Sequence, residues 1–229
     1  MAAALIHFEK LSRTYGSGQS EVRALDKVDL FIDEGEFVAI VGSSGSGKTT
    51  CLNILGCLDR PTSGKYQFGG ADVSGLNPTQ RALLRRHYIG FVFQGYNLLA
   101  RTTALDNVEL ALVYRGVKPR ERRIAAYKAL ELVGLTGRER HTPEQLSGGQ
   151  QQRVAIARAI VTEPSVILAD EPTGNLDSAR GKEIMGLLDS LNRDRGITIV
   201  MVTHDSAMVA YAHRIIRFHD GQIAEAGAT

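Results

Sequence analysis

Phe37-Val-Ala-Ile-Val-Gly-Ser-Ser-Gly-Ser-Gly-Lys48-Thr49 is the stretch of sequence that decides the fold. It opens with an apolar run typical of a buried strand, and the residues after Lys48 follow the pattern of a helix. Between them lies a GxxxxGK[ST] motif, in which backbone N–H groups, the helix N-terminus and Lys48 hold phosphate oxygens and the Thr49 hydroxyl binds Mg²⁺. A merely flexible Gly/Ser loop is the alternative, but such a loop needs no Lys-Thr at its end.

A second motif, Val166-Ile-Leu-Ala-Asp170-Glu171, places two carboxylates after an apolar run. Open α/β sheets bind ligands at the carboxyl ends of their strands, where this pair is expected. Because adjacent side chains of an extended segment point in opposite directions, the two acids should have different tasks. We expect Asp170 to hold the Mg²⁺ shell and Glu171 to polarise an attacking water. Alone, such a pair is more often a solvated turn, but the preceding phosphate loop favours catalysis.

A third motif, Leu146-Ser147-Gly148-Gly149-Gln150, precedes a good helix-forming segment and is a second helix start suited to an anion. Taken alone, Ser147 would more often be only a helix cap. The chain, however, has two phosphate-binding helix starts but only one Lys48 and one Asp-Glu pair. We therefore expect the third motif to close over a nucleotide held by another copy of the chain.

The composition of the 229 residues is that of a globular protein, with 43% hydrophobic residues and with 27 Lys and Arg against 25 Asp and Glu. This balance argues against a dedicated nucleic-acid binder. No apolar run approaches the roughly 18 residues of a membrane-spanning helix, and the first ten residues lack the plan of a signal peptide, so we expect a cytosolic protein. Cys51 and Cys57 have neither redox nor metal-ligand spacing, which predicts buried free thiols.

Short runs rich in Val, Ile and Phe predict strands at residues 5–8, 28–32, 37–41, 89–93, 166–169, 197–202 and 214–218. Several are unbroken, as in strands covered on both faces, and helical patterns follow them at 49–56 and 179–193. These features predict an α/β fold with a mostly parallel sheet. Residues 95–163 show helical periodicity instead and predict an inserted helical subdomain. The periodic apolar residues are Leu105, Val108 and Leu112, followed by Ile124, Tyr127, Leu130 and Leu132.

In this order the three motifs resemble those of the nucleotide-binding domain of ABC transporters, and the resemblance covers essentially the whole chain. Residues 42–49 match its Walker A motif, 166–171 its Walker B motif with the catalytic Glu, and 146–150 its signature. The resemblance implies a P-loop NTPase core with a mostly parallel sheet, an N-terminal antiparallel β subdomain and the helical subdomain. One ABC ATPase domain would then span residues 1–229, with 1–94 and 164–229 as the core and 95–163 as the helical part.

The resemblance also implies roles for single residues. Gln94 matches the Q-loop residue that contacts Mg²⁺ and the attacking water, and His204 matches the switch histidine at the γ-phosphate. Tyr15 matches the aromatic that stacks on adenine, and residues 174–177 match the D-loop across a dimer. Alone, His204 or Gln94 would more often be a solvated loop residue, and an isolated Tyr near an N-terminus is usually packing.

Together these matches imply ATP as substrate, Mg²⁺ as cofactor, and an ATP-dependent homodimer. The implied ATP contacts within one copy are Tyr15, Gly42, Ser43, Ser44, Gly45, Ser46, Gly47, Lys48, Thr49, Thr50 and Asp170. Those from the second copy are Ser147, Gly148, Gly149, Gln150 and Asp177. The implied Mg²⁺ contacts are Thr49, Gln94 and, through water, Asp170, and the implied catalytic residues are Glu171, His204 and Gln94.

The residues within and around the motifs narrow the resemblance to one branch of the family. Residues 53–59, 90–99, 150–153 and 169–177 are similar to the branch of the exporter ATPase MacB, the lipoprotein-release ATPase LolD and the division protein FtsE, and the triple Gln favours MacB-like members. MacB-like proteins often carry their membrane segment on the same chain. Since this chain ends at Thr229, we expect a separate permease, with a periplasmic adaptor as an option, at the inner face of the cytoplasmic membrane.

Three functions stay open at this point: an export or extrusion ATPase, an FtsE-like regulatory ATPase of cell division, and a soluble ABC ATPase for iron–sulfur assembly or DNA work. The third is disfavoured because no coiled-coil or zinc-bearing insertion fits between Lys48 and Ser147. The motifs do not decide between the first two. In either case the resemblance places the permease against residues 94–99 and 105–114.

Overall fold

Strands β3 (Phe37–Gly42), β8 (Thr198–Val202) and β7 (Val166–Asp170) form the centre of a six-stranded sheet in the computed structural model, which describes residues 4–228. The strand order is β10-β9-β3-β8-β7-β6, and all neighbouring pairs are parallel except β9 and β10. The remaining strands are β6 (Ile89–Phe93), β9 (Arg214–His219) and β10 (Gln222–Ala228). The predicted mostly parallel sheet is therefore confirmed. Met1–Ala3 and Thr229, within the expected domain limits, lie outside the described residues.

The central strands are apolar along their whole length because both of their faces are buried. On β3, Val38 and Ile40 face one hydrophobic cluster, whereas Phe37 and Ala39 face the other. All four are fully buried. The strand period of two thus divides a continuous apolar run between two cores, which is why the sequence shows no alternation there.

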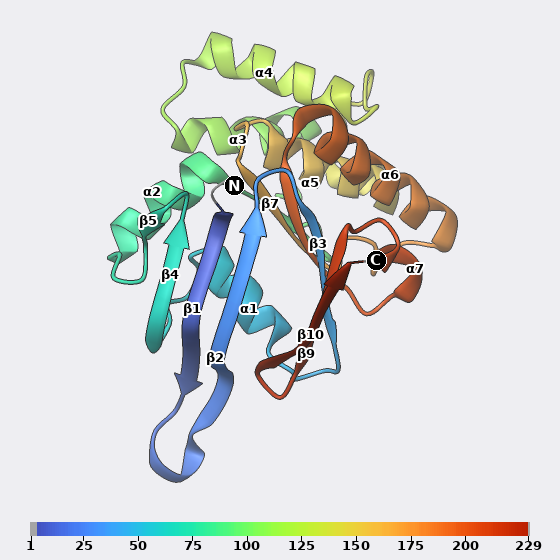
Figure 1. The fold of residues 1–229 in the computed structure, drawn as a ribbon. Coiled ribbons are helices and arrows are strands. Elements are labelled where there is room, and N and C mark those ends of the chain that lie inside the picture. Colours follow the sequence, from blue (N-terminus) through green and yellow to red (C-terminus); the bar gives the residue numbers. More distant parts are fainter. Residues whose placement is uncertain (1–3, 229) are drawn as a thin grey trace.

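A four-stranded antiparallel sheet of order β2-β1-β4-β5 covers one of these cores, and the implied antiparallel sheet is confirmed (Figure 1). Helix α1 (Lys48–Leu55) lies between the two sheets and contributes its buried residues to this core. The fully buried Tyr66 donates its hydroxyl to the Leu55 carbonyl at 2.8 Å, which joins β4 to α1. The strands are β1 (Ala4–Tyr15), β2 (Val22–Asp33), β4 (Ser63–Phe68) and β5 (Ala71–Asp72).

Helices cover the other face of the parallel sheet (Figure 1). Among the described residues between β6 and β7 no strand occurs, and the helices there pack on one another and on β6. They are α3 (Ala104–Tyr114), α4 (Pro119–Leu132) and α5 (Gly148–Ile160). The other helices are α2 (Pro78–Tyr88), α6 (Ser178–Arg195) and α7 (Ser206–Val209), with single 3₁₀ turns at Gly18–Ser20 and Pro143–Gln145.

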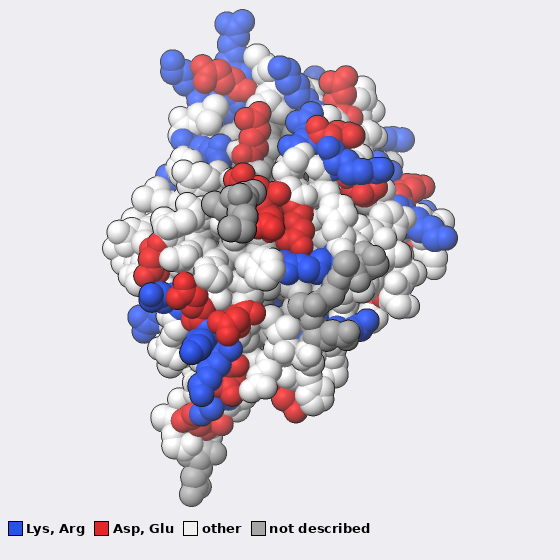
Figure 2. Space-filling model, in the orientation of Figure 1, with Lys and Arg blue, Asp and Glu red and all other residues white. Residues whose placement is uncertain are grey.

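Helix α4 buries a different face from the one its large apolar residues suggest. Its buried residues are Ala126, Ala129 and Leu130, whereas Ile124 and Tyr127 are exposed. The buried face thus consists of small alanines with Leu130, and the large Ile124 and Tyr127 are left on the outer side. No helix of the described chain is both long and apolar enough to cross a bilayer. On the face seen in Figure 2, Lys and Arg are interspersed with Asp and Glu.

The two cysteines of the core yield a prediction about reactivity. Both are buried and free, as expected, and burial raises the pKa of Cys51 to about 12 and that of Cys57 to about 11. Because the thiolate is the reactive species, both should react with DTNB at pH 8 on the order of 100-fold more slowly in the folded chain than in guanidinium. The rate of colour release measures this. Fast modification of the folded protein would show that α1 opens away from the core.

Candidate functional site

The parallel pairing brings the predicted site residues to one edge of the sheet. The last residue of β6, Phe93, is in register with Asp170, Asp170 with Val202, and Val202 with Ile40. The four strands therefore end side by side. The residues that follow or end them are Gln94 at β6, Asp170 and Glu171 at β7, His204 beyond β8, and the phosphate loop at residues 42–49 after β3.

The phosphate loop needs glycine where its backbone passes close to other segments. Gly42 has φ 155°, and a Cβ there would lie 2.4 Å from the Phe218 carbonyl oxygen. Gly47 has φ 106°, and its Cβ would lie 2.6 Å from the Ala24 carbonyl oxygen. Any side chain at either position would collide with backbone, so β9 and β2 hold the loop between them.

The polar groups of the loop are arranged around Lys48. Its ammonium donates to the carbonyls of Gly42 at 2.9 Å and Ser43 at 2.7 Å. The Ser46 hydroxyl is buried in the loop and has no hydrogen-bond partner among the described residues. Beside the loop lies a cavity of about 350 Å³, lined by Val22, Arg23, Ala24, Gly45, Gly47, Lys48, Thr49, Thr50, Asp220 and Gly221. The loop side of this cavity offers backbone N–H groups, hydroxyls and Lys48, which suit an anion, and Arg23 and Asp220 also line it.

Glu171 and His204 are in direct contact. His204 Nδ1 and Glu171 Oε1 are 2.8 Å apart, and the Glu171 N–H donates to the Val202 carbonyl at 2.9 Å. Glu171 has φ 45°, a strained conformation for a residue with a side chain, so the chain turns sharply at the end of β7. Burial and the charge of Glu171 raise the pKa of Asp170, whereas Lys48 acts in the opposite direction. Asp170 is thus placed where a further cation would favour its ionised form.

Gln94 lies against the predicted D-loop. Its Nε2 donates to Asn175 Oδ1 at 3.3 Å, and Asn175 Nδ2 donates to the Gln94 carbonyl at 2.9 Å. A Cβ on Gly174 would come within 2.6 Å of Gln94 Nε2. The two segments therefore interlock, which sequence reasoning missed because Gln94 and Asn175 are 81 residues apart. A contact of Gln94 with Mg²⁺ stays a prediction.

Tyr15 is held by two residues that sequence reasoning missed. Its hydroxyl donates to Asp59 Oδ2 at 2.7 Å, Arg13 Nε donates to the same oxygen at 2.9 Å, and the Arg13 guanidinium lies 4.3 Å from the ring centroid. Burial acts to raise the pKa of Asp59, but the hydrogen bonds from Tyr15 and from the Arg60 N–H, together with the charge and hydrogen bond of Arg13, outweigh it and lower the pKa. Tyr15 pairs with Val22, which lines the cavity beside the phosphate loop. The backbone of Tyr15 thus lies beside a residue that lines the cavity, and stacking of its ring on adenine stays a prediction.

The signature residues begin α5 and lie apart from this cavity. The Ser147 hydroxyl accepts from the Gln150 N–H at 3.3 Å, and the Ser147 N–H donates to Gln150 Oε1 at 3.0 Å, so the two form a capping box. Asp177 caps α6 by accepting from the Arg180 N–H at 3.0 Å. None of the described residues that line the cavity comes from α5 or α6. Their predicted contacts with a second copy stay predictions.

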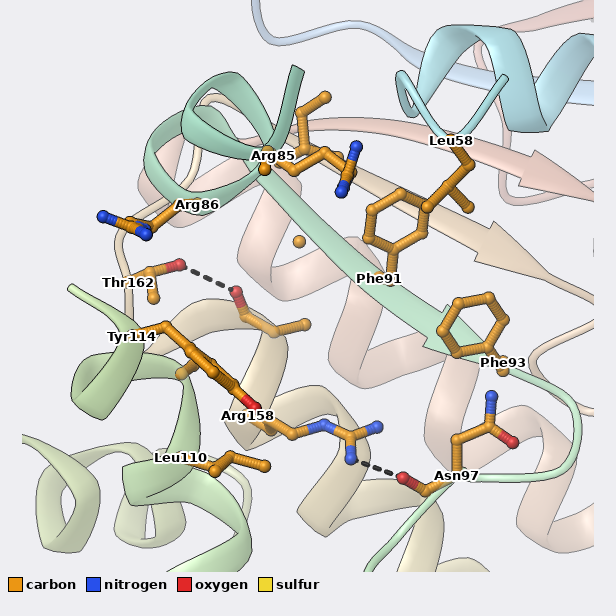
Figure 3. A pocket seen from close by; sticks show the side chains of 15 residues that line it. Leu58, Arg85, Arg86, Phe91, Phe93, Asn97, Leu110, Tyr114, Arg158 and Thr162 are labelled. Carbon is orange, nitrogen blue, oxygen red and sulfur yellow. Dashed lines mark hydrogen bonds between the residues drawn. The ribbon is translucent and has the colours of Figure 1, made fainter. Parts of the chain in front are cut away.

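A groove of about 520 Å³ lies between α2, β6, α3 and α5 (Figure 3). Its side chains are mainly apolar, with three arginines and no acidic residue among those described. The apolar ones include Leu58, Phe91, Phe93, Leu110, Ala111 and Tyr114, and the arginines are Arg85, Arg86 and Arg158. The region expected to receive a permease thus includes a groove, but Leu98 packs against the inner core instead of lining it.

Known proteins share the region that contains the three motifs. Residues 25–174 match the ABC transporter family. The chain is 54% identical over 97% of its length to the macrolide export ATP-binding/permease protein MacB of Hyphomonas neptunium, and 53% identical over 96% to that of Rhodospirillum rubrum. It spans 34% of either protein, about a third of their length.

Solved structures resemble nearly the whole chain. The dimeric ATP-binding cassette MJ0796 in a post-hydrolysis state with ADP and Pi has a TM-score of 0.89 and 45% identity, over 97% of this chain and 98% of that one. For cbiO1 of Clostridium perfringens, part of the transporter complex cbiONQ, the TM-score is 0.89 with 31% identity, over 98% of this chain and 88% of that one.

The phosphate loop yields a prediction about nucleotide affinity. Lys48→Ala removes the loop's only lysine, and only backbone and hydroxyl donors remain, so affinity for Mg-ATP should fall by about 10- to 100-fold, as for a lost charged hydrogen bond. Equilibrium titration with a fluorescent ATP analogue measures this. Lys65→Ala, at an exposed lysine of β4, is the control and should leave affinity unchanged. Unchanged affinity in Lys48→Ala would refute the phosphate-loop assignment.

Proposed function

This chain belongs to the ABC transporter family, and we propose that it is the ATP-binding and ATP-hydrolysing cassette of a transporter that exports its substrate through a membrane permease. The observation that carries the proposal is the Glu171–His204 contact of 2.8 Å at the sheet edge that also holds Asp170 and the phosphate loop. The relatives described above are named for macrolide export, so the cell-division alternative is not favoured.

Hydrolysis uses these residues in sequence. The phosphate loop and Lys48 hold the β- and γ-phosphates, and Glu171 accepts a proton from water as the water oxygen bonds to the γ-phosphorus. The bond from that phosphorus to the bridging oxygen breaks, and its electrons leave with ADP. His204 orients the Glu171 carboxylate through their contact.

The donor set at this edge fits Mg²⁺. The Thr49 hydroxyl, the Asp170 carboxylate and the Gln94 side-chain oxygen are hard oxygen donors that would hold Mg²⁺, and the ion would neutralise charge on the phosphates. The raised pKa of Asp170 agrees with a carboxylate whose charge would be stabilised by a bound cation. Among the described residues, the charge of Lys48 opposes that rise in the pKa of Asp170.

A second copy of the chain completes the site. Ser147 and Asp177 are exposed at helix starts outside the cavity of their own copy, where they can reach a nucleotide held by a partner. The MJ0796 cassette, which shares the fold over nearly its whole length, is dimeric. ATP would then join two copies, and ADP would release them because it lacks the phosphate that the signature holds.

The groove of Figure 3 would receive the permease. It is open and mainly apolar, and it is lined by Phe93, the last residue before Gln94. A permease segment seated there would touch the strand end that carries a catalytic residue. Movement of that segment and hydrolysis would therefore be linked.

The general base yields the central test. Glu171→Gln keeps size and hydrogen bonding but removes the proton acceptor, so hydrolysis should fall by on the order of 10²- to 10⁴-fold while ATP binding survives. Because stalled hydrolysis keeps ATP in place, this variant should be a dimer in Mg-ATP and a monomer in ADP. Phosphate release and light scattering measure the two effects.

Adding Ser147→Arg to Glu171→Gln is the matched variant for the shared site. The arginine fills the start of α5, so the dimer should be lost while each monomer still binds nucleotide. A Glu171→Gln protein that hydrolyses ATP at the normal rate would refute the proposed base. One that stays monomeric in saturating Mg-ATP would refute a shared site in the isolated chain.

The groove yields a test of coupling. Leu58→Asp with Tyr114→Asp places two charges on exposed groove residues, and a carboxylate buried against an apolar segment is costly. In the transporter assembled with its permease, stimulation of hydrolysis by the permease should be largely lost, while the free cassette keeps its basal rate. Val113→Asp, at an exposed neighbour outside the groove lining, is the control. Full stimulation in the double variant would place the docking surface elsewhere.

A further inference from the structure

Arg158 of α5 holds two successive carbonyls of the turn that follows β6. Its Nη1 donates to the Asn97 carbonyl at 2.6 Å, which Figure 3 shows, and its Nη2 donates to the Tyr96 carbonyl at 2.9 Å. A guanidinium presents its N–H groups in a rigid fork and can bind both oxygens at once. An ammonium on a flexible stem lacks this geometry.

The cation is partly withdrawn from water, and carbonyl dipoles are its partners. Burial lowers the pKa of Arg158, and no carboxylate among the described residues acts against that shift. Arginine nonetheless stays protonated near neutral pH. Its bonds to the turn are therefore charge-assisted and stronger than bonds between neutral groups.

The turn needs such support because its backbone is strained. Tyr96 has φ 59° and Asn97 has φ 49°, both in the left-handed region that residues with a side chain enter at a cost. Such a conformation persists only where the surroundings hold it. Besides short-range bonds within the turn, the two bonds from Arg158 fix it to a helix 61 and 62 residues away in the sequence.

The same turn touches the signature and the D-loop. A Cβ on Gly148, the first residue of α5, would come within 2.9 Å of the Tyr96 hydroxyl, so that hydroxyl lies against the signature backbone. Two residues before Tyr96, the side chain of Gln94 lies against Gly174, where a Cβ would come within 2.6 Å of its Nε2. A change in the turn would therefore move Gln94 relative to both segments.

We propose that Arg158 is a positioning residue for ATP hydrolysis: by binding the carbonyls of Tyr96 and Asn97 it keeps Gln94 in a fixed relation to the signature helix. The inference rests on the proposed function, in which Gln94 is a catalytic residue and an oxygen donor for Mg²⁺. Arg158 and Asn97 also line the groove of Figure 3, so a permease segment seated there contacts this clamp itself. The clamp thus connects the permease to the catalytic edge.

Arg158→Lys tests the proposal in the full chain, because it keeps the charge and the length but loses the fork. Affinity for Mg-ATP should stay within about twofold, whereas kcat should fall by on the order of 10- to 100-fold, as for a small misplacement of a catalytic group. Hydrogen exchange at the amides of residues 94–97 should become faster. Arg158→Gln, which keeps donors without the charge, carries the same expectations if Arg158→Lys does not fold.

Arg115→Lys is the matched control. Arg115 also binds two successive carbonyls, those of Arg86 at 2.8 Å and His87 at 2.6 Å, but it does not touch the turn at residues 94–97. It should leave kcat and exchange in that turn unchanged. An equal loss of kcat in both variants would show a general effect on folding and overturn the proposal.

Two further outcomes separate this inference from the proposed function. Normal kcat in Arg158→Lys, with Glu171→Gln inactive, would overturn the clamp alone. Normal hydrolysis in Glu171→Gln would overturn the proposed function whatever Arg158 does. A parallel loss of ATP affinity and kcat in Arg158→Lys would also overturn the clamp, because a positioning residue acts on the reaction and not on binding.

Discussion

The parallel pairing of β6, β7, β8 and β3 is the constraint on which the rest of the structure depends. Parallel strands end at the same edge of a sheet, so the pairing of these strands alone brings residues from four distant parts of the sequence together. Such strands must also be covered on both faces, which requires the antiparallel sheet on one side and the helices on the other. The site and the two cores are consequences of one arrangement of strands.

The loops at this edge take conformations that a chain adopts only when it is held. At Gly42 and Gly47 there is no room for a Cβ. Glu171 and Tyr96 take positive φ although they carry side chains. Strain of this kind costs of order 1–3 kcal/mol at each residue with a side chain. The buried strands before these loops supply the compensating stability. Rigid strands are therefore what allow strained loops to present catalytic groups.

Much of this organisation is readable from the sequence, because its signals are local. The runs 37–41 and 166–169 are unbroken apolar stretches, and the three motifs are contiguous. Strand β4 was missed, since Ser63, Lys65 and Gln67 leave no apolar run and its pairing partner β1 lies far away in the sequence. Long-range pairing overrides local preference in such strands.

The same reason explains which parts of the site were missed. The motifs predicted Tyr15 and Gln94 by position, but the contact of Tyr15 with Asp59 joins residues 44 apart, and that of Gln94 with Asn175 joins residues 81 apart. On α4 the periodicity of Ile124 and Tyr127 indicated a helix, yet the buried residues are Ala126, Ala129 and Leu130. The periodic spacing of large apolar residues shows where a helix lies, but the neighbouring elements decide which of its faces is buried.

The separation of signature and phosphate loop within one copy has a mechanical consequence under the proposed function. A nucleotide bound to one copy contacts the helix start of the other, so the γ-phosphate contributes to association as well as to chemistry. The turn after β6 is the element that touches the signature backbone, the D-loop and the groove. A force applied at the groove therefore reaches the residues of both copies through one short, strained segment, and a strained segment has only a few arrangements available to it. Coupling through such an element takes place between discrete conformations and not by continuous deformation.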